Sequence, residues 1–177
     1  SVRSLVIQAC AAGHTRAAFL GRVDCPHEGA RYQGYVAGIR DANADDSTII
    51  PCPDISRDAG YTAMANYLVH HNELPLDLLI AANDHRALGA IDALHQYGIA
   101  IPEQVAVTGF DNIPAAATAG LTTIHLPMRD IGTEGVKWFL HKVVGAPSNS
   151  VAQRCFPCPI IWRSTTGEHP APEENEP

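Results

Sequence analysis

The sequence predicts an α/β fold in which a mostly parallel sheet lies between two layers of helices. Two short apolar runs, at 78–82 and 105–107, flank a segment whose apolar residues Leu88, Ile91 and Leu94 recur at the period of a helix. Uninterrupted apolar strands joined by a helix are typical of parallel strands that are covered on both faces. We therefore expect a three-layer α/β/α sandwich.

The segments before this central unit follow the same alternation. Four apolar residues at helical spacing precede Gly13, which is suited to ending a helix, and Ser56 has the side chain of a helix N-cap. The predicted elements are, in order, a helix at 1–12, a strand at 17–20, a helix at about 29–42, a strand at 48–50 and a helix at 56–70. From residue 17 to residue 109 the order is β-α-β-α-β-α-β.

After the central unit the pattern is less regular. A strand is predicted at 121–124, followed by a helix with an apolar stripe from Ile131 to Val143. Residues 152–163 resemble a strand, and their prolines are typical of a sheet edge. Residues 164–177 are rich in Pro and Glu and offer nothing to bury, so we expect a disordered tail or a linker.

Composition is typical of a globular protein and unfavourable for binding DNA directly. Apolar residues make up 46% of the 177 residues, and the net charge is −7 with no two Lys or Arg adjacent. Binding to the phosphate backbone needs clustered cations. Five scattered cysteines, an odd number, fit a reduced cytoplasmic setting. Apolar stretches stay well below the roughly 20 residues of a membrane span, and no secretory leader is recognisable, so we expect no membrane partner.

Motifs of catalysis and metal binding are absent from the sequence. There is no G-x-S-x-G elbow, Gly-rich phosphate loop or dinucleotide fingerprint, and the nine histidines form no H-E-x-x-H motif. Cys155 and Cys158 have redox-motif spacing, but they lie on a proline-broken strand and lack the second pair that a zinc site needs. We expect a protein that is not an enzyme and uses no cofactor or metal.

Polar residues follow both strands of the central unit. Asn83 and Asp84 come after the first strand, and Asp111 and Asn112 come after the second. Because ligands of parallel sheets bind at the carboxyl ends of the strands, these side chains indicate a ligand site at one edge of the sheet. The alternative is local: Asn83 and Asp84 could only cap the following helix, and Asp111 could be an ordinary turn residue.

Five motifs occur in one order and at characteristic spacings: GHTRAAFLG, ARYQGYVAGI, AANDHRALGAIDAL, IPEQVAVTGFDN and LTTIHLP. Together they strongly resemble the effector-binding domain of lac-repressor-type transcriptional regulators, which shares its fold with periplasmic sugar-binding proteins. The resemblance covers roughly residues 13–163. It implies a two-lobed domain hinged around a small-molecule site, in a protein that normally carries an N-terminal helix-turn-helix and binds DNA as a homodimer.

The resemblance also implies roles for individual residues. Arg31 matches the arginine of the R-x-x-G motif, Asn83 the asparagine of A-N-D and Asp111 the acid after G-F, all of which contact ligand in sugar-binding members. Ile55 falls where many members carry an aromatic ring that stacks on the ligand, and this difference weakens a sugar assignment. His27 lies in a loop where members place further ligand contacts.

The same resemblance divides the chain into lobes. Residues 13–163 are the effector-binding domain, with a C-terminal lobe at about 17–119 and a returning segment of the other lobe at 121–163. Residues 1–12 are expected to be a stub of a helix from that other lobe, and both outer segments are expected to lack most of their packing partners. Leu88 and Ile91 belong either to the core or to a dimer interface.

The predicted function is therefore small-molecule sensing by a transcriptional regulator, with a sugar or related metabolite as the effector. Operator DNA would be bound only through a head that lies outside this chain. The alternative is a periplasmic solute-binding protein, or a sensor module fused to another signalling output.

Overall fold

A computed structural model describes residues 1–71, 74–144 and 154–167, apart from the side chains of residues 27, 45–47 and 144. Its elements are α1 (Val2–Ala11), β1 (Arg16–Gly21), α2 (Pro26–Ala42), β2 (Asp45–Pro51), α3 (Arg57–Val69), β3 (Leu78–Ala81), α4 (Asp84–Gln96), β4 (Ala106–Asp111), α5 (Pro114–Thr118), β5 (Thr122–His125), α6 (Met128–Val144), β6 (Ile160–Ile161) and a 3₁₀ turn at Ser164–Thr166. One six-stranded sheet has the order β2-β1-β3-β4-β5-β6, in which β6 alone is antiparallel to its neighbour.

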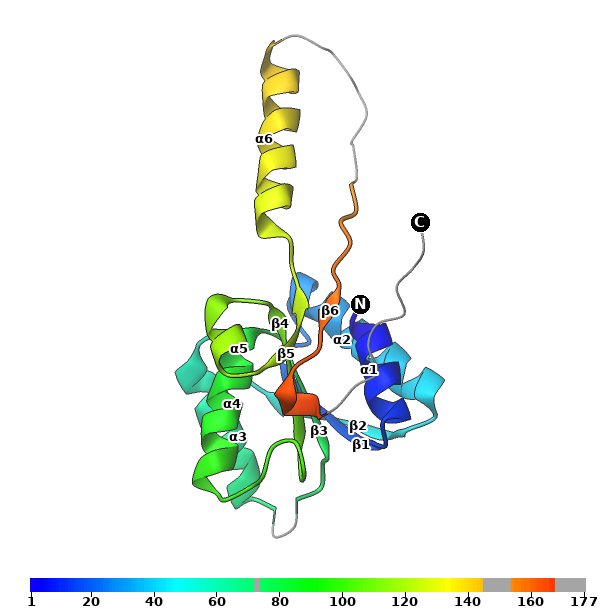
Figure 1. Ribbon diagram of the computed structural model, residues 1–177, viewed down its shortest axis with the longest axis vertical. Helices are drawn as coiled ribbons and strands as arrows, with labels where there is room; N and C mark the ends of the chain where they lie inside the picture. Colours follow the sequence, from blue (N-terminus) through cyan, green and yellow to red (C-terminus); the bar gives the residue numbers. More distant parts are fainter. Residues whose placement is uncertain (72–73, 145–153, 168–177) are drawn as a thin grey trace.

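The predicted three-layer α/β/α sandwich is confirmed. Figure 1 shows α1 and α2 on one side of the sheet and α3, α4 and α5 on the other. Successive side chains of a strand point to opposite faces, and β1 illustrates the result. Ala18 and Leu20 belong to the core cluster under α3 and α4, whereas Ala17 and Phe19 belong to the cluster under α1 and α2. All four are at most 2% exposed, so both faces of this strand are buried.

The expectation that residues 1–12 lack most of their packing partners is wrong. Leu5 and Val6 of α1 are 1% and 0% exposed, because α1 packs on α2 in the same core cluster. Close approach depends on glycine: a Cβ at Gly38 of α2 would lie 2.6 Å from the Cβ of Val6. Strand β5 is likewise fully integrated, since Thr122 and Thr123 are 0% exposed. The assignment of these segments to a second lobe stays a prediction.

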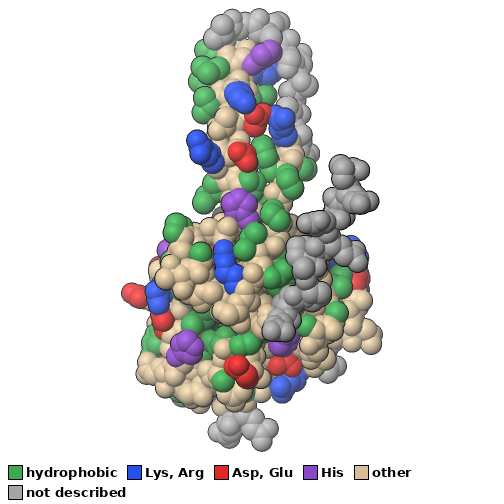
Figure 2. Space-filling model, viewed as in Figure 1, with side chains coloured by type: hydrophobic (Ala, Val, Ile, Leu, Met, Phe, Trp, Pro, Cys, Tyr) green, Lys and Arg blue, Asp and Glu red, His purple; other side chains and the backbone are tan. Residues whose placement is uncertain are grey.

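Helix α6 is different, because it projects away from the sandwich beside the segment that leads to β6 (Figure 1). Figure 2 shows apolar side chains along this projection. Trp138, Phe139 and Val143 are 49%, 60% and 65% exposed. Full burial of each such side chain would stabilise the protein by about 1.5–3 kcal/mol. Helix α6 gains little of this stabilisation, because its apolar side chains remain exposed.

The carboxyl-terminal prediction is partly wrong. Residues 164–167, expected to begin a disordered tail, are anchored: the Thr165 hydroxyl donates to the carbonyl of Val107 at 2.7 Å and accepts from the amide of Thr122 at 2.9 Å. Of the strand-like segment expected at 152–163, Ile160–Ile161 alone pairs within the described residues. Residues 168–177 lie outside the described part of the chain.

A membrane span was not expected, and among the helices of the described residues none is long and apolar enough to cross a membrane.

Candidate ligand site at the rim of the sheet

The carboxyl ends of β1, β2, β3 and β4, with the loops that follow them, form one edge of the sheet that we call the rim. The chain passes from β1 outward to β2 and then returns to β3 on the other side of β1. Such a reversal of strand order is where parallel α/β sheets bind ligands, because neighbouring loops diverge there. The topology therefore places the predicted site residues at the expected position.

Arg31 and Asp111 are brought together at this rim. Arg31 extends from the second turn of α2, and its Nη2 lies 3.8 Å from Oδ1 of Asp111. Its Nη1 donates to the carbonyl of Ala82 at the end of β3, and its guanidinium carbon lies 3.9 Å from the ring centroid of Phe110. The two charged side chains remain 19% and 23% exposed, so they are both held in place and accessible. This is the arrangement of a site that pairs with a polar ligand.

Asp111 is unusual in its backbone and in its titration. Its φ of 116° is a conformation that residues with side chains rarely adopt, and such conformations cluster at functional sites. Burial raises the pKa of the Asp111 carboxyl, and the guanidinium of Arg31 partly offsets the rise. A largely desolvated carboxylate gains from hydrogen-bond donors supplied by a ligand.

Asn83 is committed mainly to local structure. Its Oδ1 accepts from the amide of Arg86 at 2.8 Å, which caps α4, and its Nδ2 donates to the carbonyl of Ile55 at 3.1 Å. The capping interpretation is therefore confirmed. A ligand contact through the second Nδ2 hydrogen stays a prediction.

Asp84 does not point out from the rim. It is 0% exposed, its Oδ1 accepts from the Thr123 hydroxyl at 2.6 Å, and its Oδ2 accepts from the amide of Ile113 at 2.8 Å. The carboxylate thus fixes the loop after β4 and strand β5 from the start of α4. The expectation that Asp84 faces the site edge is wrong, because at the first position of α4 its side chain turns into the core.

The other two predicted contacts lie on rim loops. Ile55 is 60% exposed in the loop between β2 and α3, available to a ligand as an aliphatic surface. His27 lies in the first turn of α2, and its side chain is outside the described part of the structure.

Leu88 and Ile91 are buried within one chain. They are 4% and 8% exposed and belong to the core cluster between α3, α4 and the sheet. The structure supports the core interpretation for both side chains. A dimer interface at this helix stays a prediction.

Three residues near the rim had no assigned role in the sequence interpretation: Glu28, Arg86 and Phe110. Arg86 is 0% exposed and Glu28 is 3% exposed, and they form an ion pair with 2.7 Å between Nη1 and Oε2. A charged residue inside a helical motif normally predicts exposure. One feature of the sequence could have predicted the burial of Arg86. The residues that follow it in RALGA are small or apolar, which is typical of a buried helix face.

The buried carboxylate of Asp84 predicts a specific pH dependence. Burial is the largest cause that raises its pKa, and the bonds from Thr123 and Ile113 oppose the rise. The folded state therefore holds this proton more tightly than the unfolded chain, so the stability contributed by the group falls as pH rises from about 4 through the raised folded value. Asp84→Asn can accept from the Ile113 amide through its Oδ1 and donate from its Nδ2 to the Thr123 hydroxyl, and its stability relative to wild type should increase from pH 4 to pH 7 in guanidinium titrations.

Asp92 provides the control of opposite sign. A hydrogen bond from Arg57 is the main cause that lowers its pKa, so its contribution is present above the unfolded value and is lost as pH falls. Asp92→Asn should lose stability relative to wild type as pH rises. Profiles for Asp84→Asn that run parallel to wild type would contradict the assignment. Asp84→Ala leaves the Ile113 amide without this acceptor and should cost about 1–3 kcal/mol at pH 4, and this cost should shrink as pH rises because wild type loses the stability contributed by the buried carboxyl.

Metal and thiol chemistry find no support in the described residues, where no group of three His, Cys, Asp or Glu side chains is placed to hold an ion. Cys155 is exposed and Cys158 is half-buried, and both are free thiols.

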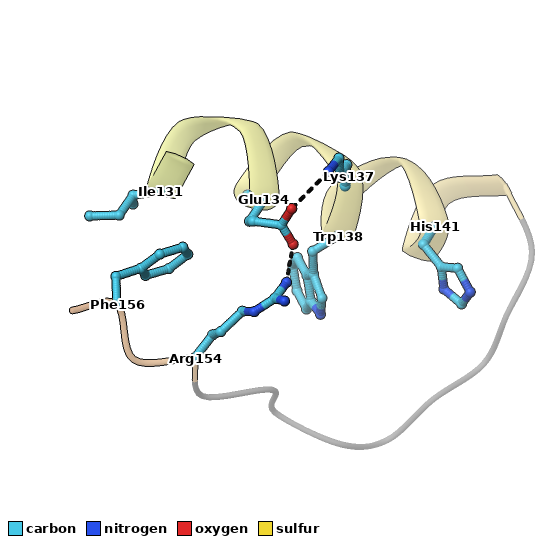
Figure 3. A pocket seen from close by; sticks show the side chains of 8 residues that line it. Ile131, Glu134, Lys137, Trp138, His141, Arg154 and Phe156 are labelled. Atoms are coloured by element: carbon cyan, nitrogen blue, oxygen red, sulfur yellow. Dashed lines mark hydrogen bonds and ion pairs between the residues drawn. The ribbon is translucent and has the colours of Figure 1, made fainter. Parts of the chain in front are cut away.

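A cavity of about 580 Å³ lies away from the rim, between α6 and the segment leading to β6. Figure 3 shows Trp138, Ile131 and Phe156 around it, with Glu134 bonded to both Lys137 and Arg154. Apolar and charged side chains of α6 and of the segment leading to β6 line it, and both segments project away from the sandwich. We therefore place the candidate site at the rim.

The sheet order and its flanking helices define a periplasmic-binding-protein-like fold. The chain belongs to the periplasmic binding protein-like domain family, whose family model matches residues 8–166. The resemblance to the effector-binding domains of lac-repressor-type regulators, which share this fold, is thereby confirmed.

Two curated relatives of this chain are repressors of sugar operons. The chain is 35% identical over 144 residues to the sucrose operon repressor of Escherichia coli, covering 78% of this chain and 42% of the relative. It is 32% identical over 136 residues to the ribose operon repressor of the same species, covering 74% and 40%. Thus the chain spans about two-fifths of the length of these curated relatives.

Two solved structures of transcription regulators have the same fold as this chain. The transcription regulator GntR from Chromobacterium violaceum is 27% identical with a TM-score of 0.81, over 93% of this chain and 61% of that one. A LacI-family transcriptional regulator from Enterococcus faecium, solved with bound ribose, shares the fold with a TM-score of 0.83 at 23% identity, over 94% of this chain and 61% of that one.

Proposed function

We propose that this chain is the effector-sensing part of a cytoplasmic, DNA-binding transcriptional regulator, and that its effector is a sugar or a related small polar metabolite. The single observation that carries the proposal is the placement of Arg31, Asp111 and Phe110 beside the end of β3, at the reversal of strand order. The relatives with the highest similarity given above are repressors of sugar operons, not enzymes, which supports binding rather than catalysis.

The chemistry of the rim fits a ligand with several hydroxyl groups. A carboxylate accepts hydrogen bonds from hydroxyls and a guanidinium donates to them, and both bonds involve a charged partner, which makes them strong. Ile55 adds an exposed aliphatic contact. A site of this kind rejects analogues that lack a hydroxyl, because the buried polar group left behind costs about 1–3 kcal/mol.

The proposed mechanism is a shift between conformations. A ligand that also contacts a second lobe binds the closed form more tightly than the open one, and the differential affinity sets how far the equilibrium moves. In a homodimer with DNA-binding heads, that shift would change how the heads fit an operator. The heads, the dimer and the operator are proposals for the whole regulator.

A thermal-shift screen of the chain tests the proposal. Sugars, sugar phosphates, nucleosides and purines would be added separately, with the melting profile serving as the folding control. A ligand at about 100 times its dissociation constant adds roughly 2.7 kcal/mol, which corresponds to about 5–10 °C in a chain of this size. We expect such a shift with one class of polyhydroxyl compound. A cooperative melt that no class displaces would contradict ligand sensing by this rim.

A further inference from the structure

We infer that Arg86 is a positioning residue of the ligand site: its buried guanidinium holds the loops after β1 and β2 in one fixed arrangement against the start of α4 before a ligand arrives. This inference rests on the proposed function in so far as the rim is the ligand site. Arg86 itself is 0% exposed and makes no contact with the outside of the molecule.

Each donor nitrogen of Arg86 reaches a different partner. Nε donates to the carbonyl of Asp54 at 2.7 Å, and Nη2 donates to the carbonyl of Cys52 at 2.9 Å. These two carbonyls lie in the loop after β2. Nη1 donates to Oε2 of Glu28 at 2.7 Å, in the first turn of α2. Because the guanidinium is planar and rigid, satisfying three directions at once fixes its partners relative to one another.

Glu28 extends the clamp along the loop after β1. Its Oε2 also accepts from the amide of Arg22 at 2.8 Å, so one carboxylate oxygen joins both ends of this loop to Arg86. The guanidinium thus joins two loops that are far apart in sequence at one buried centre. The loop after β3 is joined to Ile55 independently of this side chain, because the Arg86 backbone amide donates to Asn83 and Asn83 donates to the carbonyl of Ile55.

The clamp acts on the candidate ligand contacts without touching them. Arg31 lies one helical turn beyond Glu28, so fixing Glu28 fixes the turn from which Arg31 reaches Asp111. Ile55 lies next to Asp54, whose carbonyl Arg86 holds. A buried ion pair is weak support for stability but can specify a unique arrangement, which is the role assigned here.

The test compares Arg86→Met with Leu94→Ala, a fully buried position two turns further along the same helix. Amide hydrogen exchange of the 177-residue chain would be measured without ligand. Arg86→Met should speed exchange at least tenfold in residues 22–28 and 52–56 relative to the core strands, whereas Leu94→Ala should not favour these loops. Equal acceleration in both variants would overturn the clamp.

A double variant separates positioning from simple stability. Glu28→Gln with Arg86→Met removes the buried carboxylate charge that Arg86→Met deprives of its guanidinium partner, while leaving the loops unclamped. Its melting temperature should therefore recover, but its loop exchange should stay fast. Recovery of both would overturn the inference. For a sugar found in the thermal screen, the double variant should bind at least tenfold more weakly than wild type. Leu94→Ala should bind that sugar with an affinity within about twofold of wild type. If wild type binds no sugar, the proposed function fails, and the exchange experiment still decides the clamp.

Discussion

Asp111→Asn and Arg31→Ala should each weaken binding of the effector by about 10- to 100-fold while leaving the free chain folded with a cooperative melting transition. Hydrogen bonds that involve a charged group contribute about 1.5–3 kcal/mol, and each variant removes one such partner from the rim. The ion pair itself contributes little to folding, because both side chains are partly exposed and their nearest oxygen and nitrogen are 3.8 Å apart. Arg31→Ala also removes the bond to the Ala82 carbonyl and the contact with Phe110, so it should lower the melting temperature more than Asp111→Asn does. Titration calorimetry at a temperature well below the melting transition measures the effect.

Arg16→Ala is the matched control for this pair. Arg16 lies at the start of β1, at the opposite edge of the sheet, and forms a comparable ion pair with Asp77 at 3.4 Å. It should bind the effector with wild-type affinity. Unchanged affinity in both rim variants, or an equal loss in Arg16→Ala, would remove Arg31 and Asp111 from the site.

Gly89→Ala should destabilise the fold by about 3 kcal/mol, which lowers the melting temperature by roughly 6–12 °C. Helices α3 and α4 cross so closely that a Cβ at Gly89 would lie 1.9 Å from the carbonyl oxygen of Arg57 and 2.6 Å from the amide nitrogen of Tyr61. Both are backbone atoms, so relief requires one helix to move. Guanidinium unfolding followed by circular dichroism measures the loss.

The control substitution is Gly135→Ala in α6. Nothing lies within 4 Å of a Cβ at that position, and alanine favours a helix interior by about 0.5–1 kcal/mol over glycine. Stability should therefore stay the same or rise slightly. If Gly89→Ala unfolds at the same guanidinium concentration as wild type, α3 and α4 can move apart at no cost. The close contact between these two helices would then not contribute to stability as argued here.

The local parts of the fold could be predicted because periodicity reports burial directly. The apolar run at 78–82 became β3, and the stripe at Leu88, Ile91 and Leu94 became the buried face of α4. Elements without a period were missed or misplaced. Helix α5 has only five residues, PAAAT, and therefore no apolar stripe. Strand β2 begins at Asp45, before the predicted 48–50, because its first residues are polar and carry no apolar signal.

The site was predicted less completely, because its second half depends on long-range contacts. Arg31 and Asp111 could be placed at one edge from strand ends and from the resemblance. The burial of Arg86 could not, since it depends on Glu28, 58 positions earlier in the chain, and on two carbonyls of a third loop. Asp84 shows the same limit: a polar residue at a helix start predicts a cap or a ligand contact, and only the fold shows that it bonds Thr123 in the core.

Mapping amide chemical shifts during titration with D-ribose and with sucrose tests the central claim most directly, since it locates a ligand without assuming where it binds. The account predicts that the largest changes fall on the rim, at Arg31, Ala82 and Asn83 and at residues 110–112. Changes confined to the cavity beside Trp138 of α6, or no saturable change with either sugar at millimolar concentration, would contradict it.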